Sequence, residues 1–107
     1  MPGLNYVVVA GSLTRDPELR PVSGTSVANL RLAIDEKFRD VQGNVVDKPV
    51  FVDVEIWGPS AEECARNLRK GSAVLIEGRL RLDQWEDKQG RKRTRLLVRA
   101  LSVEPLR

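Results

Sequence analysis

The sequence contains no histidine and a single cysteine, Cys64. One cysteine cannot form a disulfide within the chain, and without histidine the common ligand sets for zinc are missing. Cys64 falls in the apolar register of a short expected helix, which favours a small core residue over a nucleophile. We therefore expect neither a metal site nor a cofactor.

Long apolar runs are also missing. The longest one near the start of the chain, Tyr6 to Ala10, is far shorter than the roughly 20 residues of a membrane-spanning helix. No signal peptide is recognisable, and one cysteine fits a reducing compartment. These features predict a cytoplasmic protein.

Side chains suited to acid–base catalysis are scarce. Without histidine, proton transfer would depend on carboxylates such as Asp53 and Glu55, which lie two residues apart on an expected open strand. Nothing in the sequence suggests an enclosed pocket around them. A binding protein is therefore favoured over an enzyme.

The charge is modest in total but uneven along the chain. With 107 residues and a net charge of +3, the chain is long enough for one domain, expected over residues 1–107. Eight basic residues stand against three acidic ones between Arg79 and Arg99. Such a run is often only a solvated hairpin, but it is also the electrostatic pattern of a nucleic-acid-binding surface.

Alternation and turn residues predict three strands in the first half of the chain. The first covers residues 5–13, with a bend or bulge at Gly11, and a loop follows through Pro21 and Ser23-Gly24. The second covers 26–35, with the even-numbered residues from Ala28 to Ile34 facing inward. The polar stretch over 39–48 predicts a long flexible hairpin that projects from the body, before a third strand over 50–57.

The second half predicts one helix and two strands. Ser60 and Glu63 have the spacing of a capping box, and Gly71 stands where a helix would end. A fourth strand follows from Ala73, a hairpin turn over 87–90 and a fifth strand over 94–103. This order predicts an all-β fold with one helix, the five-stranded Greek-key barrel known as the OB-fold, which binds oligonucleotides across its second and third strands.

Four of the five aromatic residues lie in charged segments: Phe38, Phe51, Trp57 and Trp85. Alternation places Phe51 and Trp57 opposite the valines of their strand, and places Trp85 in register with Arg79 and Arg81. Rings beside arginines are typical of proteins that stack unpaired bases. The alternative is that Phe51 and Trp57 pack under a loop or in a subunit interface.

Several blocks in order make the chain similar to the bacterial single-stranded DNA-binding protein (SSB) family. They are Asn5–Gly11, Leu13–Arg20, Gly24 with Val27–Leu30, Leu68–Ser72, Glu77–Arg81, and Trp85–Asp87 with Gly90. The resemblance implies sequence-independent binding and protection of single-stranded DNA in replication, recombination and repair, in a cytoplasmic, nucleoid-associated protein.

The resemblance also implies site residues. Base stacking falls to Phe38, Phe51, Trp57 and Trp85; the commonest family members have tryptophan at the first two positions and phenylalanine at the third. The basic residues expected to contact phosphates are Arg31, Lys37, Arg39, Arg79, Arg81, Lys88, Arg91, Lys92 and Arg93.

In one respect this sequence departs from the family. Members usually carry a flexible linker and an acidic tip beyond the barrel, whereas this sequence stops at Glu104-Pro105-Leu106-Arg107. It is either trimmed or a tailless relative, and recruitment of proteins through a tail is not expected of it. Two alternatives stay open: a PriB-like primosomal accessory protein, and an RNA-binding OB module.

The first strand predicts self-association. Tyr6, Val8 and Ala10 make one face apolar, and Val7 and Val9 make the other apolar too. A strand with one solvated face should alternate, so a second copy is expected to pair with this strand across a two-fold axis. The family resemblance alone implies that such dimers form homotetramers.

Overall fold

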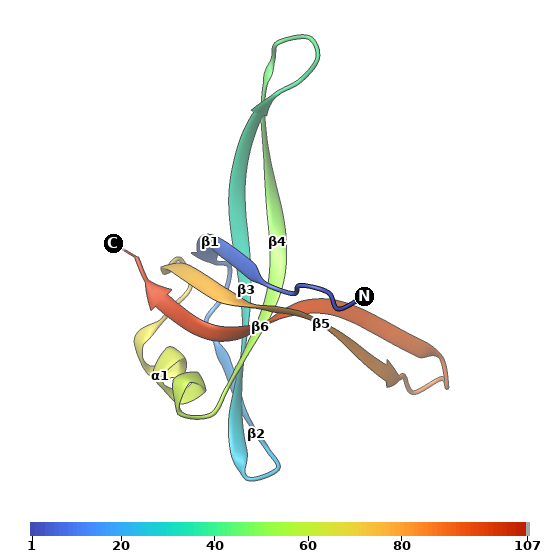
Figure 1. Ribbon diagram of the computed structural model, residues 1–107. Helices are drawn as coiled ribbons and strands as arrows, with labels where there is room; N and C mark the ends of the chain where they lie inside the picture. The colour runs from blue at the N-terminus through green and yellow to red at the C-terminus, as the bar shows by residue number, and fades with distance from the viewer. Residues whose placement is uncertain (107) are drawn as a thin grey trace.

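The computed structural model describes residues 1–106; Arg107, the last residue of the predicted domain, lies outside the described residues. Its strands are β1 (Val7–Leu13), β2 (Glu18–Val22), β3 (Thr25–Arg39), β4 (Val45–Trp57), β5 (Ala73–Glu86) and β6 (Lys92–Pro105), and its one described helix is α1 (Pro59–Asn67). Long ribbons of paired strands project from a small central body, against which α1 packs (Figure 1).

The strands close into a barrel. Their order is β1-β5-β6-β4-β3-β2, and a further pairing of β1 with β3 completes the ring. β4 and β6 run parallel, with Val54 opposite Val98, while the other pairs are antiparallel. Because β1 and β2 pair with successive parts of β3, they act as one interrupted strand. The five-stranded OB-fold predicted from the element order is confirmed.

β2 corrects the prediction of a loop before the second strand. Pro21 lies within β2, opposite Ser26 of β3. Proline lacks an N–H, but β2 pairs only with β3, and an edge strand tolerates the missing donor. Ser23 and Gly24 both have positive φ, 50° and 81°, as a tight two-residue hairpin requires.

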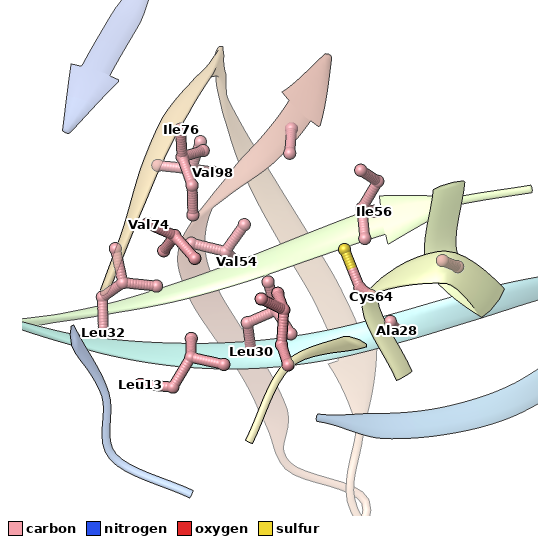
Figure 2. Close-up of a cluster of buried hydrophobic side chains, with 13 residues drawn as sticks. Leu13, Ala28, Leu30, Leu32, Val54, Ile56, Cys64, Val74, Ile76 and Val98 are labelled. Atoms are coloured by element: carbon pink, nitrogen blue, oxygen red, sulfur yellow. The ribbon is translucent and has the colours of Figure 1, made fainter. Parts of the chain in front are cut away.

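The core lies inside the barrel and under α1. The inward residues predicted for the second strand, Ala28, Leu30 and Leu32, are buried there with Val54 and Ile76 (Figure 2). Cys64 belongs to the same cluster, which confirms its interpretation as a core residue. Burial raises the pKa of the Cys64 thiol, with a smaller contribution from Glu63, so its reactive thiolate form is disfavoured.

Not every residue of the inward register is buried. Val50, Leu80 and Leu82 follow the predicted alternation, yet each is at least 44% exposed. They lie where the β3–β4 and β5–β6 ribbons extend beyond the barrel (Figure 1). The projecting hairpin predicted between the second and third strands is confirmed, and β3 and β4 stay paired along it as far as Arg39 and Val45 (Figure 1). Only the tight turn at 40–44 separates them, and Asp40 Oδ1 accepts from the amides of Gln42 and Asn44 at 2.9 Å.

The predicted ends of the helix are wrong. α1 begins after Gly58, whose φ is 78°, and no side chain caps it. Proline is favoured at the first helical position, so the helix starts at Pro59 and Ser60 lies inside it, which rules out the capping box. The backbone turns extended at Leu68, a buried core residue, three residues before Gly71. The Gly71 amide instead donates to Leu13 O at 2.8 Å, joining this turn to β1.

Gly11 is a site of close approach and not a bulge. It pairs in register with Val74, and a Cβ at this position would collide with the carbonyl oxygen of Ala33 on β3. The bulge occurs between β5 and β6, where Gly78 pairs with Ala100 and Glu77 with Ser102, leaving Leu101 as the extra residue. Among the described residues no helix is long and apolar enough to cross a membrane.

Candidate nucleic-acid interface

One face of the sheet, on the side away from the core, gathers most of the predicted site. We call it the outer face and define it by the strand register of Arg31 on β3, Phe51, Asp53, Glu55 and Trp57 on β4, Arg93, Arg95, Leu97 and Arg99 on β6, and Arg79, Arg81, Asp83 and Trp85 on β5. The alternation predicted for the third and fourth strands is confirmed, since these residues alternate with the core register, although Leu97 and Glu55 on this face are themselves buried.

Phe51 is the more exposed ring on β4. Half of it is accessible, and the Arg31 guanidinium lies over it, with Cζ 5.2 Å from the ring centroid. Arg31 pairs with Asp53 across the β3–β4 ladder, and its Nη1 donates to Asp53 Oδ1 at 3.1 Å. A cation at this distance is attracted by the negative face of the ring. Arg31 is therefore held by the carboxylate and the ring together.

Trp57 has a similar arrangement, in which the arginine comes from β6 and not from β3. Arg99 lies over its ring, with Cζ 5.0 Å from the centroid, and Arg99 Nε donates to Glu55 Oε1 at 3.0 Å. Glu55 was expected on an open strand but is only 4% exposed. Its position opposite Arg99 in the β4–β6 ladder explains how a carboxylate can be buried, because a charged partner satisfies it.

Trp57 is less exposed than the other three rings. Its ring is part-buried, and its Nε1 is buried with no hydrogen-bond partner among residues 1–106. Trp57 also pairs across the ladder with the fully buried Val27. The alternative prediction, that Trp57 packs within the protein, is therefore correct for part of its side chain. Phe51 does not share that burial.

Trp85 lies on the β5–β6 ribbon. It is about half exposed, and Arg93 is its cross-strand partner. Arg79 and Arg81 share its register, as predicted. Arg81 lies 3.9 Å and Arg95 3.6 Å from carboxylate oxygens of Asp83. Arg79 has no carboxylate within ion-pair distance among residues 1–106 and lies directly opposite Arg99.

Phe38 is not brought together with the rings of β4. It pairs with Val46 near the end of the β3–β4 ribbon, in the register opposite to that of Phe51, and is half exposed. Lys37 and Arg39 flank it in the register of Phe51. Arg39 Nη1 donates to Gly43 O at 3.0 Å within the turn. The ribbon therefore carries an aromatic ring on one face and cations on the other.

The tip of the β5–β6 ribbon is organised by Asp87. Its carboxylate accepts from the amides of Gln89 and Arg91 and lies 3.4 Å from Arg91 and 3.1 Å from Arg93. The Arg91 amide, then the Arg93 side chain and the Gln89 amide, hold the pKa of Asp87 below its ordinary value. Lys88 is exposed in the turn, and Lys92 lies in the register opposite to Trp85.

Four functional residues were not predicted from the sequence: Asp53, Glu55, Arg95 and Arg99. All four lie on the outer face. Asp53 bonds Arg31, Glu55 bonds Arg99, and Arg95 lies beside Asp83. Two acids between two aromatic residues were a usable signal, because carboxylates on a partly covered face need cationic partners. The partners themselves lie 22 and 44 residues away in sequence.

Apolar side chains are also exposed along β1 and just before it. Val7 and Val9 pack against the core, whereas Tyr6 and Val8 are more than half exposed. β1 pairs with β5 along its length but with β3 only through Ser12 and Leu13. Its other edge is therefore unpaired from Val7 to Gly11 within the described residues.

Known proteins resemble this chain in sequence and in structure. Residues 4–106 match the model of the "Single-strand binding protein family". Proteins named single-stranded DNA-binding protein are 44% identical in Helicobacter hepaticus and 43% identical in Wolinella succinogenes, each over 95% of this chain. The matches cover 61% and 64% of those relatives, so the chain spans under two thirds of their length.

A solved structure has the same fold. The single-stranded DNA-binding protein of Thermus aquaticus, as a deletion mutant, superposes with a TM-score of 0.88 at 35% sequence identity, covering 98% of this chain and 51% of that one. The outer face, the barrel order and these matches agree, and the chain belongs to the single-strand binding protein family.

Proposed function

We propose that this chain binds single-stranded DNA without sequence preference. The main observation behind this proposal is the pair of rings on β4, Phe51 and Trp57, which share the outer face with arginines of the neighbouring strands. Every base has a π-face, so rings set in a cationic groove bind unpaired bases regardless of sequence. The names of the relatives support the same ligand.

Two further rings extend the site beyond the barrel. Phe38 and Trp85 lie on the β3–β4 and β5–β6 ribbons and are each about half exposed. A DNA strand that crosses the outer face can stack on Phe51, Trp57 and Trp85. It reaches a fourth position, Phe38, by passing around the β3–β4 ribbon, because Phe38 lies in the opposite register. This path suits a role in protecting single strands during replication, recombination and repair.

The phosphate contacts we propose are cations without a strong internal partner. Arg79 is the clearest candidate for such a contact. The described ion pairs also include none of the exposed cations Lys37, Arg39, Lys88 and Lys92. Arg81 pairs with the part-exposed Asp83, which Arg95 also neutralises, so phosphate can take its place. Arg91 and Arg93 pair with Asp87, which still accepts from the amides of Gln89 and Arg91 if these arginines turn to a phosphate. Binding through such cations weakens as salt rises, because counterions are released.

Self-association is part of the proposal. The unpaired edge of β1 and the exposed Tyr6 and Val8 suit pairing with a second copy across a two-fold axis. A homotetramer built from two such dimers would let one DNA strand contact several barrels, which raises apparent affinity without new contacts. We further propose that the chain is not an enzyme. A labelled oligonucleotide incubated with the protein and Mg²⁺ should therefore remain intact.

Tryptophan fluorescence tests DNA binding directly. Oligothymidylate should quench the emission of Trp57 and Trp85 as bases stack on them, and a duplex of matched length should do so far less. Unchanged emission at saturating oligothymidylate would contradict the proposed site. Competition with an RNA oligomer of equal sequence decides between DNA and RNA, because RNA selectivity requires contacts to the 2′-hydroxyl.

A further inference from the structure

β4 carries the same three-part arrangement twice. Each unit consists of a ring, a carboxylate two residues away, and an arginine from a neighbouring strand that bonds the carboxylate and lies over the ring. The first is Phe51, Asp53 and Arg31 of β3, and the second is Trp57, Glu55 and Arg99 of β6. We call them the Arg31 unit and the Arg99 unit. Two strands on opposite sides of β4 therefore supply equivalent arginines.

The carboxylates lie deeper than the arginines that they bond. The side chains of Asp53 and Glu55 are 24% and 5% exposed, against 39% and 37% for Arg31 and Arg99. If Arg99 left its unit to bind a phosphate, it would leave the buried Glu55 unpaired, which strongly disfavours that movement. Asp53 is more exposed and holds Arg31 less strongly, but Arg31 also gains from its position over the Phe51 ring. The arginines should therefore stay over the rings when nucleic acid binds.

Arg79 has a different setting. It is exposed, lies opposite Arg99 in the β5–β6 ladder, and has no carboxylate partner among residues 1–106. Neutralisation of Arg99 by Glu55 also lowers the repulsion between these two facing arginines. The outer face thus contains two kinds of arginine, those neutralised over rings and those free to meet phosphates.

From these settings we infer that Arg31 and Arg99 are base-stacking residues of the interface and do not act as phosphate contacts. A base that approaches either unit meets a guanidinium beside an aromatic ring, and guanidinium planes stack on bases as aromatic rings do. Asp53 and Glu55 are positioning residues that hold these planes. The inference rests on the proposed binding of single-stranded DNA and gives Arg31 a role different from the one expected from sequence.

The salt dependence of binding separates the two roles. Each phosphate contact contributes about 0.7 to the slope of log Kobs against log [NaCl] for single strands. The experiment measures binding of fluorescein-labelled oligothymidylate by anisotropy across a series of NaCl concentrations. Arg79→Gln serves as the control for a phosphate contact, and its slope should be smaller than that of the unaltered protein by about 0.7.

The test variants remove whole ion pairs, since Arg99→Gln alone would leave the buried Glu55 unpaired. The double variants are Glu55→Gln with Arg99→Gln, and Asp53→Asn with Arg31→Gln. We expect each to bind at least about fivefold more weakly, the lower range for loss of one stack, with the slope of the unaltered protein. A slope smaller by about 0.7 in these variants would overturn the inference. The more exposed Arg31 unit keeps the test valid if the Arg99 double variant fails to fold.

Arg99→Lys gives an independent readout, because it keeps the charge and loses the planar group. It should weaken binding severalfold without changing the slope, whereas unchanged affinity would overturn the role of Arg99. If the unaltered protein does not bind oligothymidylate, the proposed function fails and this inference fails with it. If it binds and only the slopes or Arg99→Lys disagree, the proposed function stands and the inference alone is wrong.

Discussion

Arg99 and Glu55 are joined by a hydrogen-bonded ion pair of 3.0 Å, although 44 residues separate them in the chain. The parallel ladder between β4 and β6 sets them side by side, and the same arginine lies over Trp57. The pair fixes where a positive charge and an aromatic ring meet on the outer face.

Trp85→Ala should weaken binding of single-stranded DNA by about 1–3 kcal/mol, the usual contribution of one base stack. The ring is half exposed at the end of a ribbon, so its loss should barely change thermal stability. Anisotropy titration and a thermal melt measure the two effects. Trp57→Ala is the matched comparison: it should lower affinity by a similar amount and also lower the melting temperature, because Trp57 is part-buried beside Val27. Normal binding by both variants would contradict the stacking role.

Val54→Ala should destabilise the fold by about 2 kcal/mol, because it leaves a cavity in the core. Val54 is 2% exposed, whereas Val50, in the same strand register, is 44% exposed on the ribbon. Val50→Ala should therefore change the free energy of unfolding only slightly. Urea unfolding of both variants measures the difference, and equal losses would mean that the ribbon is packed against something in solution.

Asp87 should contribute a pH-dependent part of stability. Its pKa is lowered in the folded protein, first by the amide of Arg91, so folding favours its ionised form. This stabilisation is present above the pKa of the unfolded chain and is lost as the pH falls through the lower folded pKa. Asp87→Asn should therefore lower the urea midpoint at neutral pH, and the difference from the unaltered protein should shrink as the pH falls below the ordinary range of a carboxyl group. A difference that grows with acidity would contradict this assignment.

The exposed face and unpaired edge of β1 make self-association testable. Sedimentation equilibrium at micromolar concentration should give a mass above that of the monomer. Val8→Lys should shift the equilibrium toward monomer, since Val8 is 51% exposed beside that edge. Val41→Lys is a suitable control, as Val41 is fully exposed in the β3–β4 turn. A monomeric mass for the unaltered protein would refute the pairing, and a dimer that forms no tetramer would favour the PriB-like alternative.

The sequence by itself determined which residues share a strand face. Alternation is a local property of extended backbone, so the buried register of Ala28, Leu30 and Leu32 and the outer register of Phe51 and Trp57 were predictable. The order of strands and helix also sufficed to predict the barrel. Turn residues were reliable where both flanks were strands, as at Ser23-Gly24 and at residues 87–90.

Only the tertiary structure decided how far each register is buried and which charges meet. Val50 and Leu82 have the pattern of core residues but lie on ribbons that leave the barrel, and alternation does not record where a sheet ends. The helix ends where Leu68 is buried in extended backbone, a packing event that overrode the local signal of Gly71. Glu55 is buried because Arg99 arrives from β6. Ion pairs across a barrel depend on the register of strands that are distant in sequence, and a local pattern cannot specify that register.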